Sequence, residues 1–159
     1  ITFSQSVNYS PYDMAHTNYT FNAYRNTPSP SIQMNAQFAS VTQEEGQYTL
    51  ACIHFLRSVT KMFFGINDLA GSPKAGTPPP VLTFSAFGPQ SFNMVPVVVE
   101  SFSTNYDSQT DLKDIDGTNL PVLMNMFIGL SVQQNPDRQK NVYSTSGFIN
   151  GSMYKEGFI

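Results

Sequence analysis

Residues 31–40, with the sequence SIQMNAQFAS, decide the fold class of this chain. Apolar and polar side chains alternate along the stretch, and the apolar ones stand at every second position: Ile32, Met34, Ala36 and Phe38. Successive side chains of a β-strand point to opposite faces of the sheet. The stretch therefore predicts a half-buried strand with one apolar and one polar face.

The period changes directly after this strand. Thr42 and Glu45 fit a capping box, in which both side chains accept hydrogen bonds from backbone amides at a helix start. Apolar residues then recur at helical spacing, and Gly65 provides an end, which predicts one long helix over residues 42–64: the stripe is Tyr48, Cys52, Phe55, Val59 and Met62. A second apolar group lies off this stripe and favours a second partner for the helix, although a large core could also cover it: Leu50, Ile53 and Phe64.

Three further segments have the pattern of strands. Val81–Phe87 and Phe92–Thr104 follow the proline-rich run Gly76–Pro80, and Pro96 predicts an interruption of the second one at a bulge. Residues 124–132 again alternate apolar and other side chains, beginning with Met124 and Met126. Strands, one helix and three more strands predict an α+β fold, with an antiparallel sheet closed into a sandwich or barrel.

The chain divides into three parts on these patterns. Residues 1–30 predict an extended N-terminal arm, residues 31–135 a β domain with the helix, and residues 136–159 an irregular C-terminal extension. No window approaches the ~20 apolar residues that span a membrane. The chain begins with Ile1 rather than Met, so we expect a processed protein or an ordered part of a longer one.

The composition is poor in charge and rich in neutral polar groups. Charged residues make up 12% of the chain, about half of the ~25% typical of soluble domains, and 53 of the 159 residues are Asn, Ser, Thr or Gln. Interface cores are depleted in charge, so such a surface suits an assembly subunit, although a β-rich monomer with polar loops fits equally well. The 8 Lys and Arg residues are scattered and the net charge is −3, which argues against tight nucleic-acid binding.

No catalytic, cofactor-binding or metal-binding group emerges from the sequence. His16 and His54 have no nucleophile or carboxylate partner in register, and Cys52 is interpreted as a buried structural cysteine. The one dense carboxylate group does not have the spacing of a calcium loop and is interpreted as a solvated loop between strands: Asp107, Asp111, Asp114 and Asp116. We therefore expect a protein that is not an enzyme.

An ordered set of features over residues 31–135 resembles the tube domain of baseplate tail-tube proteins of contractile-tailed bacteriophages. The features are the alternating strand Ile32–Phe38, the helix motif Leu56-Arg57 with Lys61-Met62, the run Gly76–Leu82, Phe87-Gly88-Pro89 before a valine-rich strand, an acidic loop, and a last strand after Leu120-Pro121. The resemblance lies in their order and spacing, and it does not extend to residues 1–30.

The resemblance implies a six-fold ring of antiparallel β-sandwich subunits whose sheets join around a lumen. Such a ring would sit in the virion, assembled in the host cytoplasm, between baseplate hub proteins and the tail tube, and genome DNA would pass through it without specific binding. Its subunits would meet through the second apolar side of the helix and the edges of the alternating strands, where edges that are an aggregation hazard in a monomer become contacts. The candidate inter-subunit contacts are Leu50, Ile53, Phe64, Ile32, Met34, Met124 and Met126.

A carbohydrate-binding or adhesin β-sandwich is the alternative from a different functional class. It requires exposed aromatic side chains beside polar loops, which the N-terminal arm could supply: Tyr9, Tyr12, Tyr19 and Tyr24. A ring subunit predicts a hexamer or polymer, whereas a glycan-binding module predicts a well-behaved monomer.

Overall fold

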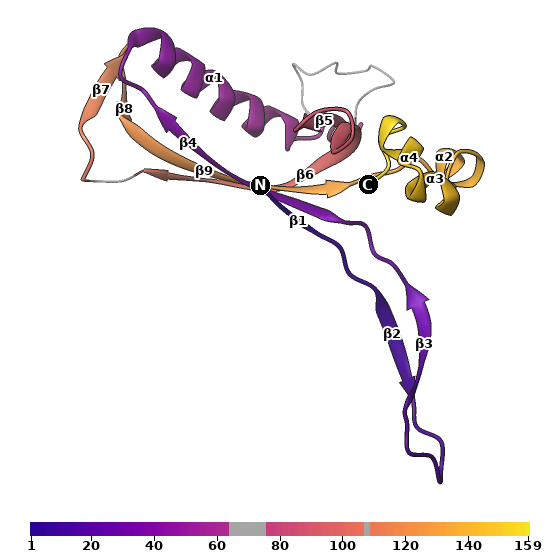
Figure 1. Cartoon of the computed structure of the whole chain (residues 1–159). Helices are drawn as coiled ribbons and strands as arrows, with labels where there is room; N and C mark the ends of the chain where they lie inside the picture. The colour runs from indigo at the N-terminus through magenta and orange to yellow at the C-terminus, as the bar shows by residue number, and fades with distance from the viewer. Residues whose placement is uncertain (64–75, 107–108) are drawn as a thin grey trace.

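A computed structural model of the chain describes residues 1–63, 76–106 and 109–159. Nine strands and four helices lie within these ranges, as Figure 1 shows: β1 (Thr2–Ser4), β2 (Asn8–Tyr12), β3 (Phe21–Asn26), β4 (Ser31–Ala39), α1 (Gln43–Val59), β5 (Leu82–Ala86), β6 (Phe92–Tyr106), β7 (Leu112–Ile115), β8 (Thr118–Pro121), β9 (Leu123–Val132), α2 (Pro136–Asn141), α3 (Thr145–Ile149) and α4 (Ser152–Lys155).

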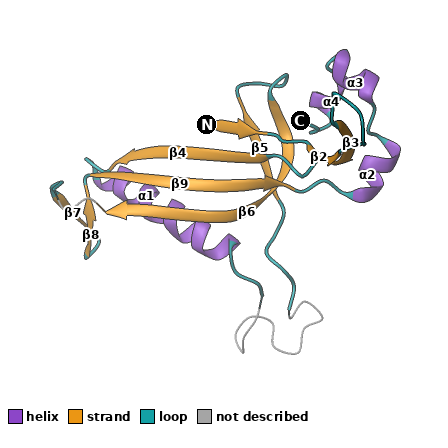
Figure 2. Cartoon of the chain, turned by 90° about the horizontal axis from the view of Figure 1, so that it is seen from below, coloured by secondary structure: helices purple, strands orange, loops and turns teal. Residues whose placement is uncertain are grey.

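The main sheet has five strands in the order β1-β4-β9-β6-β5, and every neighbouring pair is antiparallel. Two separate two-stranded ribbons accompany it, β2–β3 and β7–β8. The expected α+β class with antiparallel pairing is therefore confirmed. The expected closure into a sandwich or barrel is not seen within the described residues, where the main sheet is open and curled, with α1 lying across one face (Figures 1 and 2).

Strand alternation builds the core. The β4–β9 register runs from Ser31 opposite Ser131 to Ala39 opposite Leu123, so that the apolar side chains of both strands share one face. The core residues of this face form two groups, one at each end of the sheet. Ile32, Val95, Val97, Leu130 and Val132 make up the first group, and Met124 and Met126 join Ile53 and Leu56 of α1 in the second.

Strand β6 runs through the proline that was expected to interrupt it. Pro96 pairs with Thr83 of β5, and its carbonyl accepts a hydrogen bond from the Gln133 amide at 2.9 Å. The register against β9 instead shifts between Val99 and Ser101. A Cβ on Gly129, which pairs with Ser101, would come 2.7 Å from the Ser101 hydroxyl, so glycine makes room for the bulge.

Helix α1 starts where the capping box predicts. The Thr42 hydroxyl accepts from the Glu45 amide, and the Glu45 carboxylate accepts from the Thr42 amide at 2.9 Å. The helix ends at Val59, however, and not at residue 64. Thr60 caps it with a hydroxyl bonded to the carbonyls of Leu56 and Arg57, and the Phe63 amide then donates to the Thr77 carbonyl. A turn that returns the chain toward β5 therefore replaces the last predicted helical turn.

The β7–β8 ribbon holds the start of α1 against the sheet. Ile115 is fully buried, and a Cβ on Gly46 would come within 2.6 Å of its Cγ1 atom, so only glycine fits there. Asp116 accepts hydrogen bonds from the side-chain amides of Gln43 and Gln47, both at 2.9 Å. The sequence predicted a solvated loop here, because the pairing partner of an acidic side chain on a distant helix cannot be read from local pattern.

The C-terminal extension is helical and not irregular. α2, α3 and α4 pack beside the sheet end, and the Gln134 amide donates to the Gly157 carbonyl at 2.6 Å. Gly157 has φ +76°, and a Cβ there would come 2.7 Å from the Met94 carbonyl oxygen. This close approach ties the C-terminus to the beginning of β6.

The N-terminal residues divide between the sheet and a projecting arm. β1 pairs with β4 at the sheet edge, whereas β2 and β3 form a two-stranded arm that extends away from the rest of the molecule (Figure 1). Tyr9 and Tyr24 touch edge to face, with ring centroids 6.2 Å apart. Tyr19 at the tip is 87% exposed.

The capping box makes stability depend on pH. Backbone amides of Thr42 and Val41 donate to the Glu45 carboxylate and hold its pKa below the ordinary 4.5. Ionised Glu45 therefore stabilises the folded chain above about pH 4.5, and this contribution is lost as the pH falls through the folded pKa. In urea unfolding, Glu45→Gln should lower the midpoint at neutral pH. At acidic pH the midpoint of the variant should approach that of the wild type. Glu44→Gln, in the same helical turn, is the control. A difference in urea midpoint between Glu45→Gln and the wild type that stays constant with pH would contradict this account.

Candidate assembly surfaces

Two free edges bound the helix-covered end of the main sheet. β1 pairs only with Ser31–Gln33, so the outer edge of β4 from Met34 to Ala39 has no partner strand in the part of the chain that the structure describes. On the other side, β5 pairs only with the first half of β6, and Val98–Tyr106 is likewise open among the described residues. Unpaired edges present rows of backbone donors and acceptors to another strand.

The sheet carries almost no charge to protect these edges. Glu100, at the bulge, is the one charged residue in its five strands. The face turned away from α1, where Phe127 and Leu123 are also exposed, is instead lined mainly by exposed amides and hydroxyls: Gln33, Asn35, Gln37, Ser101, Ser103 and Asn105. Monomeric proteins usually blunt their edges with lysines, inward-pointing charges or covering segments. Neutral, open edges of this length suit pairing with another chain.

An apolar groove of about 430 Å³ lies between α1 and the sheet. Its walls come from the helix and from four strands, and the lining side chains include Met34, Phe38, Cys52, Phe55, Phe84 and Ile128. Cys52 also hydrogen-bonds the Tyr48 hydroxyl and thereby raises the Tyr48 pKa. The groove leaves the middle of the apolar sheet face uncovered by the described residues.

The buried side of α1 differs from the predicted stripe, of which only Val59 is buried. Ile53, Leu56 and Val59 face the core, whereas Tyr48 is 66% and Phe55 53% exposed. The stripe that was expected to rest on the sheet thus remains partly open at the groove. Apolar residues lie on more than one side of α1, and contact with Met124 and Met126 of β9 selects the side containing Ile53 and Leu56.

The predicted inter-subunit contacts differ in how accessible they are in the single chain. Four of them are internal core residues with 2% or less of their surface exposed: Ile32, Ile53, Met124 and Met126. Met34 and Leu50 are half-buried, and Met34 lines the groove, so these two remain compatible with a contact. Phe64 lies outside the described residues.

Sequence reasoning placed subunit contacts at the edges of the alternating strands, but it could not say which edges lack a partner strand. An alternating pattern predicts which face of a strand is buried, but pairing depends on the lengths of neighbouring strands. β1 has three residues and β4 has nine, and this mismatch leaves the edge open. The signal available in the sequence was the near absence of charge from residues 75–99 and 123–132.

The structure brings together no obvious centre for chemistry in its described parts. Those residues contain no group of three or more His, Cys, Asp or Glu side chains that could hold a metal ion. Asp114 accepts from the Gly117 amide and Asp116 binds α1, while Asp107 lies outside the described ranges. No described helix is both long and apolar enough to cross a bilayer.

No protein-family model matches the chain, and no curated protein matches it.

Substitutions of Met126 and Leu123 test whether the core lies between β9 and α1. Met126 is fully buried under α1, whereas Leu123, on the opposite face of β9, is 44% exposed. Met126→Ala should lower the free energy of unfolding by about 2–5 kcal/mol, because it leaves a cavity. Leu123→Ala should lower it by less than about 1 kcal/mol. Urea unfolding of dilute protein measures both, and equal losses would show that Met126 does not lie in the core.

Proposed function

We propose that this chain is a structural subunit of a bacteriophage virion, six copies of which form a ring at the baseplate end of a contractile tail. The ring starts or joins the tail tube and surrounds the passage for genome DNA. The observation that carries this proposal is the pair of open edges on opposite sides of one sheet, along β4 and along β6.

Two different edges on one subunit favour a ring over a two-fold dimer. When the β6 edge of one copy meets the β4 edge of the next, the contact is heterologous, and repeated rotation closes it into a ring or extends it as a helix. Every copy then has both edges covered, and the sheets join into one continuous barrel. The number six comes from the resemblance of residues 31–135 to tail-tube domains.

The uncharged sheet face supports the role as a DNA passage. DNA-binding proteins gain affinity by placing Lys and Arg against phosphates. The amide- and hydroxyl-lined face of β4, β9 and β6 contains no cation, so DNA could slide along it without being held. This face would line the lumen, while α1 and the groove would face outward or toward neighbours. The partners are further copies of the chain, hub proteins on one side and tube proteins on the other.

The carbohydrate-binding alternative has less structural support at its predicted residues. Tyr9, Tyr12 and Tyr24 lie on the two strands of the arm and Tyr19 at its tip, and none of them lines the groove beside α1. This alternative predicts a monomer that binds a glycan at all protein concentrations.

A charge pair on the two edges tests the ring. Gln37 of β4 and Ser103 of β6 are exposed near the middle of the free edges and share the polar face. The wild-type chain should form six-fold rings at high concentration, seen by electron microscopy and by mass in light scattering. Gln37→Lys combined with Ser103→Lys should reduce ring formation at least ten-fold, because like charges across paired strands repel.

The matched variant is Gln37→Lys with Ser103→Glu, which should restore rings through opposite charges. His54→Lys, on the exposed side of α1, controls for added charge elsewhere. A wild-type chain that stays monomeric at every concentration refutes the proposed function. Rings that persist in the double-lysine variant would refute pairing through these edges.

A further inference from the structure

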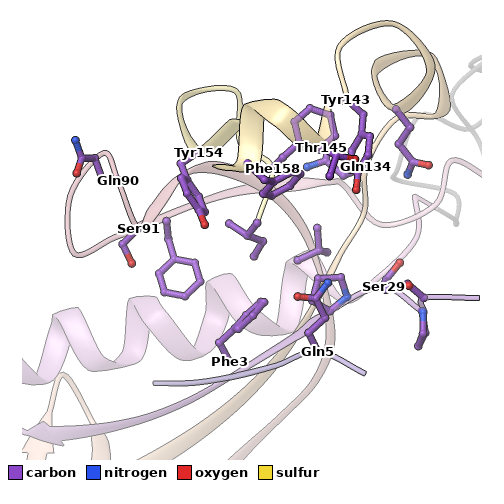
Figure 3. Close-up of a pocket in the computed structure, with 18 residues that line it drawn as sticks. Phe3, Gln5, Ser29, Gln90, Ser91, Gln134, Tyr143, Thr145, Tyr154 and Phe158 are labelled. Carbon is purple, nitrogen blue, oxygen red and sulfur yellow. The ribbon is translucent and has the colours of Figure 1, made fainter. Parts of the chain in front are cut away.

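A second hollow, of about 860 Å³, lies at the other end of the sheet from the free edges (Figure 3). The root of the N-terminal hairpin, the start of β6 and the C-terminal helices enclose it. Figure 3 shows Phe3 on one side of this space and Tyr154 and Phe158 on the other. Six aromatic side chains contribute to the lining: Phe3, Phe92, Tyr143, Phe148, Tyr154 and Phe158.

The aromatic wall is held in place by contacts among its own members. Tyr143 packs on Phe148 and on Phe158, with ring centroids 5.5 and 5.9 Å apart, and the Arg138 guanidinium stacks over Phe158 at 5.5 Å. On the sheet side, the rings of Phe3 and Phe92 meet edge to face, with their centroids 6.0 Å apart. A site formed from rings that already support each other loses little freedom when a ligand enters.

The lining is aromatic and neutral. No Asp, Glu, Lys or Arg side chain contributes to it, and its polar groups are amides and hydroxyls, such as those of Gln5, Ser29 and Gln134. The Oε1 atom of Gln134 is buried and has no hydrogen-bond partner among the described residues, while its Nε2 atom donates to Gly157. The site thus suits an uncharged ligand with flat apolar faces, carbonyls that accept hydrogen bonds and at least one donor.

An extended proline-rich segment has these properties. Consecutive prolines hold a left-handed polyproline II helix, which presents ring faces and free carbonyls and loses little entropy on binding. Aromatic-lined grooves with amide and hydroxyl donors are the usual receptors for such segments. Prolines have no N–H group, so the donor for Gln134 would come from a residue beside them.

The chain itself carries such a segment. Pro78, Pro79 and Pro80 are exposed, lie outside any helix or strand, and lead into Val81, which is 55% exposed and has a backbone N–H. Residues 75–99 contain no charged side chain, matching the neutral hollow. None of Pro78, Pro79 and Pro80 lines the hollow of its own chain. The segment enters β5 at Leu82, opposite Val97, and the hollow extends from Val132, which pairs with Val97, to Phe92 at the other end of the β5–β6 pair.

We propose that this aromatic hollow binds the Pro78–Pro80 segment of a second copy of the chain. The segment and the hollow are different surfaces, so the contact is head to tail, and it adds a second connection between the copies of the ring or between stacked rings. The inference rests on the proposed function only in requiring that copies of the chain associate. Binding of the proline segment to the hollow is measured separately.

A labelled peptide of residues 76–83, GTPPPVLT, tests the proposal by fluorescence anisotropy with the full chain kept dilute. The peptide should bind, and a peptide with alanine in place of the three prolines should bind at least ten-fold more weakly. Tyr143→Ala should weaken binding at least ten-fold by removing part of the wall. Because Tyr143 also supports its neighbours, Gln5→Lys, which places a charge at an exposed lining position, is the second variant with the same expected loss. Tyr12→Ala, on the arm, should leave binding unchanged.

Each other outcome overturns the proposal in a distinct way. Equal binding of the alanine peptide, or no binding of either peptide, refutes proline recognition. If a neutral glucan oligosaccharide binds the hollow and the peptide does not, the hollow is a saccharide site. If peptide binding is absent but the wild type still forms rings, this inference fails while the proposed function stands. If the peptide binds but copies never associate, the proposed function fails and the segment's source is another protein.

Discussion

The pairing of β4 with β9 is the interaction on which the other parts of this structure depend. Nine consecutive residue pairs, from Ser31–Ser131 to Ala39–Leu123, set Met34 beside Ile128 and Phe38 beside Met124. A slip of one residue would turn the apolar side chains to the opposite face, so burial under α1 strongly selects this register. The same register fixes the opposite face as a largely polar surface of amides and hydroxyls that also exposes Phe127 and Leu123.

The central position of β9 determines which edges of the main sheet lack a partner strand among the described residues. β9 has partner strands on both sides. Its neighbours β4 and β6 are longer than their own outer partners β1 and β5 and extend beyond them. A sheet with one charged residue in five strands has little of the usual protection against pairing with other chains. Low charge, open edges and an uncovered apolar groove are the features that the proposed ring would use, because each leaves the sheet able to take another chain.

The two ends of the sheet carry different chemistry. At one end the β7–β8 ribbon and the capping box fix α1 through Ile115, Asp116 and Glu45, and the surface beside it consists of backbone edges. At the other end the C-terminal helices return to β6 through Gly157 and enclose an aromatic, neutral hollow. Edges recognise any suitable strand, whereas a shaped hollow discriminates by side chain. The specificity of assembly would therefore come from the hollow and its continuity from the edges.

By itself, the sequence determined the features that depend on local period and local hydrogen bonding. Alternation predicted β4 and β9 to within a residue or two, and the Thr42–Glu45 pair predicted the start of α1, because both signals act between residues close in the chain. Tertiary structure decided which apolar side of α1 is buried, since apolar residues lie on more than one side and contact with Met124 and Met126 distinguishes them. It also decided the end of α1 at Val59, the clamp of Gly46 by Ile115, and the hollow, whose walls join residues 3, 92 and 158. Such long-range contacts leave no periodic pattern in the sequence, because they form between residues that are far apart in the chain.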